Sequence, residues 1–158
     1  MKTFTKLAAL AAAAILSGCV NNQAPYDYTA FKASNPRSIL VLPPINESVD
    51  VNAVNGMLAR TTLPLAESGY YVFPIAVVQQ TFRQNGLDNP KDIHAVQLDK
   101  LNEIFGADAV LYLTVKNYGT SYLVIMSDTS VTADAVLKDA RTGQKLWSGT
   151  ATASSSEG

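Results

Sequence analysis

The sequence has 158 residues, of which 47% are hydrophobic and 16% are charged. Its 13 acidic and 12 basic side chains nearly cancel, so no basic excess favours nucleic acid or anionic lipid as a partner. The single cysteine excludes an intramolecular disulfide, and the length suits one domain with a single core rather than two.

Residues 1–18 are predicted to be a lipoprotein signal peptide. Lys2 and Lys6 precede an apolar run of about ten residues, which is too short to cross a hydrocarbon core of about 30 Å as a helix. The run ends at Leu16 to Cys19 in a pattern similar to the lipobox, where bacteria attach diacylglycerol to the cysteine thiol and cleave before it. We therefore predict a mature chain that begins at a lipidated, acylated Cys19 and has these acyl chains as its membrane anchor.

Residues 19–36 are interpreted as the lipidated N-terminus and a tether, because they are polar, carry two prolines and show no sustained period. The aromatic residues Tyr26, Tyr28 and Phe31 leave a second interpretation open. In that interpretation this segment packs onto the domain, since aromatic side chains gain much from burial.

The next segment alternates strand and helix patterns. Ser38 to Leu42 is a short apolar run closed by two prolines, which is typical of a strand buried on both faces, and we expect it to be central in the sheet. From Val51 to Leu65 apolar residues recur at steps of three and four, which predicts a helix. Pro64 should kink or end this helix, and Gly69 is suited to its C-terminal stop.

Two more strands and two more helices follow in this half. Tyr70 to Phe73 predicts a strand, and Pro74 to Gly86 predicts a helix with proline at its first position. The apolar stripe from Leu98 to Phe105 predicts a further helix that Gly106 ends. Ala109 to Val115 is nearly all apolar, so it predicts a third buried strand.

The remaining chain predicts β structure. Tyr122 to Leu137 fits one long strand with alternating faces, Asp139 to Gly143 supplies a turn, and Lys145 to Gly149 returns as the partner strand. The order β-α-β-α-α-β-β-β predicts a single α/β domain over residues 37–153, with a mixed sheet and helices packed on it. A low-complexity tail, residues 154–158, follows.

No pattern in the sequence predicts catalysis, a cofactor or a metal site. The one histidine, His94, lies near Asp92 in an expected loop, where a capping or surface role is common. No glycine-rich phosphate loop and no Gly-x-Ser-x-Gly occurs. We therefore predict a non-enzymatic protein. The alternative is a small-ligand-binding or enzymatic domain that uses the loops Asn46–Asp50 and Asp92–His94, since open α/β sheets place their sites at strand ends.

A protein contact is predicted in the β-rich half. If the hairpin of residues 139–147 lies at one side of the sheet, it leaves an edge whose unpaired backbone groups can accept another strand. The uncharged stretch near this hairpin supplies the candidate partner-contact residues Tyr118, Tyr122, Val124 and Met126. A homodimer with two-fold symmetry is the commonest such arrangement. The alternative is that this stretch is an internal strand or a loop.

Several runs of the sequence together resemble one family. They are Tyr26-Asp-Tyr-Thr-Ala-Phe31, Pro36-Arg-Ser-Ile-Leu-Val-Leu-Pro-Pro44, Gly69-Tyr-Tyr-Val-Phe-Pro74, Asn85-Gly-Leu87, Ile104-Phe-Gly-Ala-Asp-Ala-Val-Leu-Tyr112 and Leu146-Trp-Ser-Gly149. As a set they are similar to the bacterial lipoprotein family typified by a genome-derived neisserial antigen. The resemblance covers nearly the whole mature chain, and none of these runs is catalytic.

The resemblance implies an outer-membrane lipoprotein whose domain lies in the periplasm and is similar to the TolB amino-terminal domain and the periplasmic domain of CsgG, the curli secretion protein. It implies a protein-binding or assembly module that is accessory to a CsgG-like secretion or envelope complex. Val20 agrees with the outer membrane, because it stands where such bacteria carry an aspartate for inner-membrane retention. Proteins of this kind usually continue with a Gly-rich stretch and an apolar segment, so we expect a truncation at Gly158.

Overall fold

The computed structural model describes residues 26–51, 53–123 and 126–154. Its helices are α2 (Thr29–Ser34), α3 (Ala53–Glu67), α4 (Ile75–Gln84), α5 (Pro90–His94) and α6 (Leu98–Phe105). Its strands are β1 (Ser38–Val41), β2 (Ile45–Asn46), β3 (Tyr71–Val72), β4 (Ala109–Leu123), β5 (Met126–Asp139) and β6 (Lys145–Ser154). From β1 onward the predicted order is confirmed, with β2 and α5 as additions.

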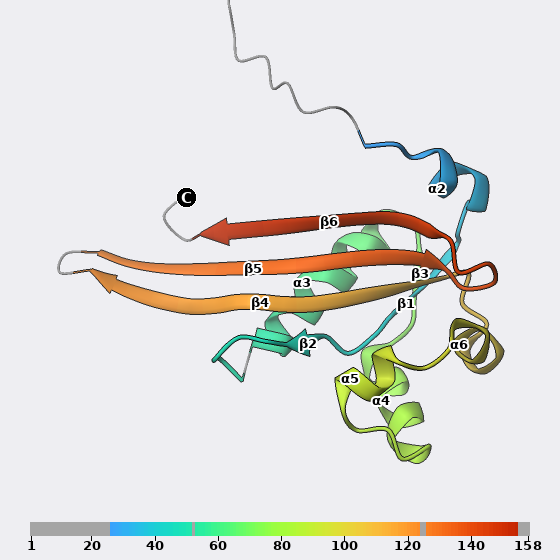
Figure 1. The fold of residues 1–158 in the computed structure, drawn as a ribbon, viewed down its shortest axis with the longest axis horizontal. Helices are drawn as coiled ribbons and strands as arrows, with labels where there is room; N and C mark the ends of the chain where they lie inside the picture. The colour runs from blue at the N-terminus through green and yellow to red at the C-terminus, as the bar shows by residue number, and fades with distance from the viewer. Residues whose placement is uncertain (1–25, 52, 124–125, 155–158) are drawn as a thin grey trace, which may run out of the picture.

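The strands form one six-stranded mixed sheet in the order β3-β1-β4-β5-β6, and the short β2 pairs with β4 (Figure 1). Strands β1, β2 and β3 are paired in parallel, whereas β4, β5 and β6 form an antiparallel meander. The predicted single α/β domain with a mixed sheet is therefore confirmed. Strand β1 lies inside the sheet, but the central strand is the much longer β4, because β5 and β6 continue the sheet beyond it.

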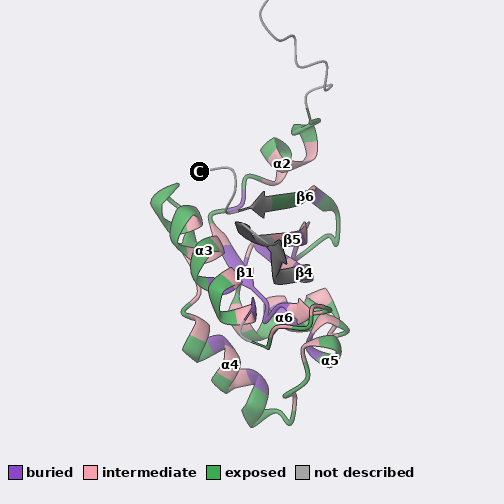
Figure 2. Ribbon diagram, turned by 90° about the vertical axis from the view of Figure 1, so that its left-hand side faces the viewer, coloured by how far each residue is buried: buried purple, intermediate pink, exposed green. Residues whose placement is uncertain are grey.

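Helices cover both faces of the sheet, and each face has its own core (Figure 2). On one face Leu40 of β1 is buried with Val78 and Phe82 of α4 and with residues of α5 and α6. On the other face Ile39 of β1 is buried with Leu58 of α3. Alternate residues of β1 thus belong to opposite cores, which explains why this strand reads as a continuous apolar run.

Helix α3 continues past Pro64 to Glu67, so the proline does not end it. A proline removes only its own donor, and the following turn still closes because the Ser68 N–H donates to the Pro64 carbonyl at 3.0 Å. The chain leaves the helix through Gly69, whose φ of 93° lies in the left-handed region that glycine tolerates.

Residues 26–36 pack onto the domain, which is the second of the two interpretations of this segment. Helix α2 places Phe31 against Tyr70, with ring centroids 6.5 Å apart. The Tyr26 hydroxyl accepts a hydrogen bond of 3.1 Å from the Ser148 N–H of β6. The tether predicted for residues 19–36 is therefore not seen from Tyr26 onward, because its aromatics find partners far along the chain; residues 19–25 lie outside the described residues.

The single long strand predicted from Tyr122 to Leu137 is wrong. Tyr122 is still part of β4, and β5 starts at Met126, so the two strands form a hairpin in which Leu123 pairs with Met126. Residues 122–126 include no glycine, proline or asparagine, the residue types that mark turns. The sequence therefore does not predict that the chain reverses here. The alternation of faces predicted for the later part of the strand is confirmed, as described below.

Candidate binding site

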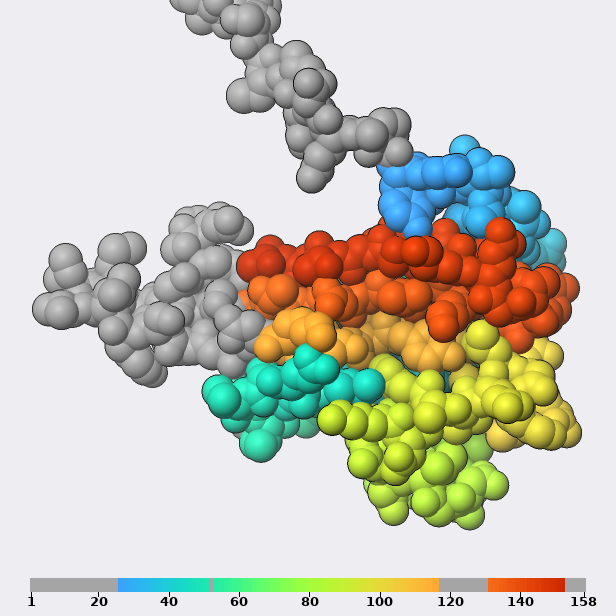
Figure 3. Space-filling model, viewed as in Figure 1, coloured from blue at the N-terminus to red at the C-terminus, as the bar shows by residue number. Residues whose placement is uncertain are grey.

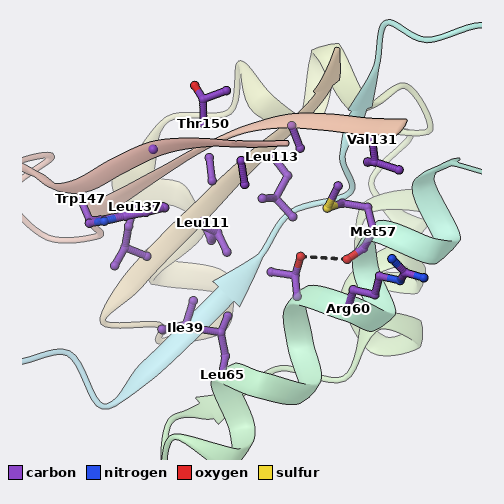
Figure 4. A pocket seen from close by; sticks show the side chains of 15 residues that line it. Ile39, Met57, Arg60, Leu65, Leu111, Leu113, Val131, Leu137, Trp147 and Thr150 are labelled. Atoms are coloured by element: carbon purple, nitrogen blue, oxygen red, sulfur yellow. Dashed lines mark hydrogen bonds between the residues drawn. The ribbon is translucent and has the colours of Figure 1, made fainter. Parts of the chain in front are cut away.

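An apolar groove of about 410 Å³ lies between α3 and the sheet (Figure 4). Met57 and Leu65 of α3 line one side, and residues of β1, β4, β5 and β6 form the floor. Much of this floor is made of small residues, namely Ala133, Ala135, Gly149 and Ala151. In Figure 4 Trp147 and Val131 stand at opposite ends of the groove. The groove is therefore an open trough that follows the long strands.

The groove exists because β5 and β6 are apolar on one face and polar on the other. Ala133 and Ala135 line the groove, while the intervening Asp134 faces away and accepts a hydrogen bond of 2.6 Å from the Thr150 hydroxyl. The hydroxyls of Thr132 and Thr152 lie 3.0 Å apart on that polar face. An antiparallel sheet with this alternation normally buries its apolar face, but here α3 covers the face only in part.

Trp147 limits one end of the groove. Its ring lies over Gly149, so closely that a Cβ atom at Gly149 would be 2.7 Å from the ring carbon Cζ2. The ring of Tyr26 is a further neighbour, at a centroid distance of 6.4 Å from the ring of Trp147. Glycine at position 149 is therefore what allows the indole ring to lie flat on β6 and form part of the groove wall.

Of the residues that line the groove, Arg60 alone is charged. Its side chain is exposed, and among the described residues it has no hydrogen bond and no ion pair. The neighbouring Thr61 hydroxyl is already engaged, because it donates to the Met57 carbonyl at 2.8 Å. The groove can therefore hold an apolar group that carries a negative charge at one side, and it offers no acid or base with a partner suited to proton transfer.

Strand β6 is an edge of the sheet and runs along the top of the domain in Figure 3. Its residues Trp147, Gly149 and Ala151 line the groove. The Ser148 N–H points away from β5, since it donates to Tyr26. Backbone groups alternate in direction along an antiparallel strand, so those of Thr150 and Thr152 also point outward. No other strand among the described residues pairs with this side of β6.

The predicted partner-contact residues lie at the far end of the β4–β5 hairpin. Tyr118 and Tyr122 belong to the outer half of β4, where they pair with Val131 and Ser127, and Met126 begins β5. Val124 lies outside the described residues, as does Cys19. The outer half of β4 pairs with β5 on one side, and no strand among the described residues pairs with its other side. The role of this stretch in binding a partner stays a prediction.

Within the described part of the chain, the residues of the alternative ligand or enzyme site line neither the groove nor a smaller cavity. His94 lies in α5 instead of a loop, and its Nε2 is 2.9 Å from the Pro43 carbonyl. Burial lowers the pKa of His94, and the hydrogen bond to Pro43 only partly offsets this. Neither His94, nor Asp92, nor the loop Asn46–Asp50 lines the groove or a smaller cavity of about 240 Å³ beside Pro43.

The described residues contain no group of three or more histidine, cysteine, aspartate or glutamate side chains that could hold a metal ion. None of the helices in the described part of the chain has the length and apolar character of a membrane span. Reasoning from the sequence missed the groove and Arg60. The alanines at alternate positions of β5 and β6 are a signal for it, because such small residues on one face of long strands leave room above the sheet.

Comparisons with known proteins agree with the family resemblance. The profile of the family described as "Putative lipoprotein GNA1162-like" matches residues 26–158. Lipoprotein NMB1124/NMB1162 of Neisseria meningitidis serogroup B is 60% identical over 143 residues, which cover 90% of this chain and 66% of that one. The chain thus spans slightly under two thirds of this relative.

Solved structures are similar as well. The crystal structure of lipoprotein GNA1162 from Neisseria meningitidis is 60% identical, with a TM-score of 0.72 over 75% of this chain and 83% of that chain. The LpoB C-terminal domain from Salmonella enterica, at 18% identity, shares the fold with a TM-score of 0.55 over 81% of this chain and 98% of that chain. The family match and the 60% identity show that this chain belongs to the GNA1162-like lipoprotein family.

Proposed function

We propose that the protein is an outer-membrane lipoprotein, anchored by lipid on Cys19, whose periplasmic α/β domain works by binding protein partners and not by catalysis. The observation that carries this proposal is the open apolar groove beside the free edge of β6. Sites that bind ligands or partners are typically concave and mostly apolar, as this groove is. The groove lacks paired titratable groups, which favours binding over chemistry.

The family supports the anchor. A lipoprotein is held at a membrane of the cell envelope, and Cys19 is the single cysteine that could take the lipid. More than one acyl chain is needed for stable anchoring, because each buried CH₂ contributes only about 0.8 kcal/mol. Val20 after this cysteine favours the outer membrane over retention in the inner one. The partner we infer is a component of a CsgG-like secretion or envelope complex.

The test is site-specific cross-linking in intact cells. A photo-reactive residue at Ala151, which is exposed and lines the groove, should form an adduct with a discrete envelope protein that mass spectrometry can identify. The matched control is the same residue at Val77, which is 54% exposed on α4 across the sheet. Equal adducts at both positions, or none at Ala151 in a correctly anchored protein, would contradict a binding role for this face.

A membrane separation tests the anchor independently. The wild-type protein should fractionate with the outer membrane, and Val20→Asp should move it towards the inner membrane. Recovery of both forms in the inner-membrane fraction would refute the proposed location and leave the binding role untouched.

A further inference from the structure

The smaller cavity, of about 240 Å³, lies beyond the carboxyl end of β1. Pro43, which follows that strand, lines it together with side chains of α3, α4 and the chain that leads into α5. We propose that this cavity binds a free α-amino acid with an apolar side chain, whose carboxylate meets Arg83 and whose ammonium group meets Asp88. This inference goes beyond the proposed function, because it concerns neither the groove nor the edge of β6.

The cavity lies at a point where the topology of the sheet changes. Strands β1 and β3 are parallel neighbours, but the chain leaves β1 for α3 on one face and leaves β3 for α4 on the other. Open α/β sheets bind their ligands in the crevice at such a point, beyond the carboxyl ends of the strands. Val54 of α3 and Gln79 of α4 both line the cavity, so it lies between the two diverging helices.

Part of the cavity wall is apolar and belongs to the core. Ile93 of α5 is buried in the core that α4, α5 and α6 share, and Leu87 packs against the same core. With Val54 they offer an apolar surface to the side chain of a ligand. The volume is below the range of about 300–1,000 Å³ that is usual for drug-sized molecules, so it suits a smaller ligand.

Two opposite charges line the same cavity without neutralising each other. Arg83 and Asp88 both line it, yet they form no ion pair with each other. Among the described residues, Arg83 donates a single side-chain hydrogen bond, of 3.4 Å, to Gln80. That distance is long for a hydrogen bond, so most of the guanidinium donors stay available. The Asp88 carboxylate has no hydrogen bond or ion pair in the described part of the chain.

A free α-amino acid matches both charges at once. A simple carboxylate would meet Arg83 but be repelled by Asp88, and a simple amine would be repelled by Arg83. The guanidinium fork also suits a carboxylate, which it can bind through two parallel hydrogen bonds. A segment of polypeptide holds its α-amino and α-carboxyl groups in peptide bonds, whatever its source, and therefore lacks this pair of charges on one carbon. The chemistry of the cavity thus favours a free amino acid over a stretch of chain.

The test is an NMR titration of the mature chain with Cys19→Ser, which takes no lipid. The probe is L-leucine. Its matched controls are leucinamide, which lacks the carboxylate, and 4-methylpentanoate, which lacks the ammonium group; both keep the side chain. We expect leucine to shift the amide signals of residues 79–93 saturably, and each analogue to bind about tenfold more weakly.

Two variants assign the ligand charges to residues. Arg83→Gln should weaken leucine binding about tenfold and remove the advantage of leucine over leucinamide. Asp88→Asn should remove the advantage of leucine over 4-methylpentanoate. The matched controls are Arg60→Gln, on the groove, and Asp92→Asn, on α5 but not lining the cavity, and both should leave leucine binding unchanged. All four side chains are exposed, and circular dichroism checks that each variant folds.

Four outcomes would overturn the inference. They are the absence of a saturable shift at residues 79–93, shifts confined to residues of the groove, equal affinities for the three probes, and equal effects of Arg83→Gln and Arg60→Gln. None of these outcomes touches the proposed protein-binding role, because cross-linking at Ala151 probes a different surface.

Discussion

Asp139 has two roles, of which only one can be predicted from the sequence: it stabilises the turn it begins, and it binds the distant helix α2. The predicted turn is present, because the carboxylate accepts hydrogen bonds of 2.9 Å from the N–H groups of Arg141 and Thr142. The same carboxylate accepts one of 2.7 Å from the Ser34 hydroxyl of α2. That contact fixes α2 to the β5–β6 turn, and no pattern links residues so far apart.

Replacing Asp139 by asparagine tests whether the hydrogen bonds to its carboxylate stabilise the fold. Burial alone would raise the pKa of Asp139, but the hydrogen bonds from Ser34, Thr142 and Arg141 outweigh it, so the pKa lies below its usual value. The charged form therefore stabilises the fold above about pH 4, and this contribution is lost as the pH falls through the folded-state pKa. Asp139→Asn should cost about 1–3 kcal/mol at pH 7 and less at pH 3, by urea unfolding. Asp88→Asn, at an exposed position, is the control. An equal loss of stability in that variant would show that the hydrogen bonds to Asp139 are not the cause.

His94 should make stability depend on pH in the opposite way from a paired histidine. Burial lowers its pKa in the folded state, so the unfolded chain binds the proton more readily. The free energy of unfolding should therefore fall as the pH drops through about 6.5 towards the folded-state pKa, and it should be unaffected by this group well above 6.5. His94→Gln should remove this part of the decline in urea unfolding between pH 7 and 5. An unchanged decline would show that His94 does not cause it.

Gly149→Ala tests the packing of the groove wall. The new methyl group would meet the Trp147 ring, so the ring must move off β6, at a cost of about 1–3 kcal/mol. Urea unfolding measures the cost, and the Trp147 emission should change as well. Gly56→Ala on α3 is the control: nothing lies within 4 Å of its added Cβ, so it should stabilise by about 0.5–1 kcal/mol. A loss at position 56 equal to that at 149 would contradict this account.

At the scale of elements, the sequence predicts the helix ends, turns and strands that depend on residues close together in the chain. Gly106, at a φ of 66°, ends α6 where the pattern places the end, and Gly143, at a φ of 73°, lies in the predicted turn. Strand β1 is recognisable because it is buried on both faces. These features depend on neighbours within a few residues, and the patterns of glycine, proline and apolar spacing carry that information.

The elements that the sequence does not predict depend on distant partners. Helix α2 has no buried residue of its own and is held by the contact of Phe31 with Tyr70 and by the hydrogen bond from Ser34 to Asp139. The outer half of β4 is a strand because it pairs with β5, although its serine, threonine and glycine residues suggest a loop. The groove is equally non-local, since Met57, Leu113 and Ala151 come together only once the strand order is known.

Tyr26→Phe tests whether α2 and its flanking residues protect the sheet edge. The change removes the hydroxyl that accepts the Ser148 N–H and keeps the ring against Trp147. We expect a loss of about 0.5–1.5 kcal/mol and faster hydrogen exchange of the Ser148 amide, measured by NMR. Tyr28→Phe is the control, because its hydroxyl has no hydrogen bond among the described residues. If Ser148 exchanges at the same rate in both variants, Tyr26 does not protect the edge.

At the scale of the whole molecule, the two faces of the sheet are covered differently. Helices α4, α5 and α6 cover β1 and the start of β4 on one face, where β5 and β6 present polar side chains such as Asp134 and Thr150. On the other face α3 leaves the apolar groove over the long strands (Figure 4).

The groove adjoins the edge strand β6, where Lys145 at the start is the only charged residue. Natural edges are usually protected by charge, proline or bulges. The first part of β6 has such protection, since its pairing with β5 is irregular near Lys145 and Tyr26 accepts the Ser148 N–H. Beyond Ser148 the edge and the apolar groove form one continuous surface suited to protein contacts.

We expect two copies of the protein to pair through their β6 edges, using the outward backbone groups of Thr150 and Thr152. A two-fold arrangement would join two sheets antiparallel, so that each edge satisfies the other. We expect the mature chain with Cys19→Ser to show a concentration-dependent dimer in sedimentation velocity. Thr152→Pro removes one outward N–H and should weaken the dimer, whereas Thr152→Val keeps that N–H and should not. A chain that stays monomeric across the series, or equal association of both variants, would mean that β6 does not pair with itself and that its edge is available to another partner.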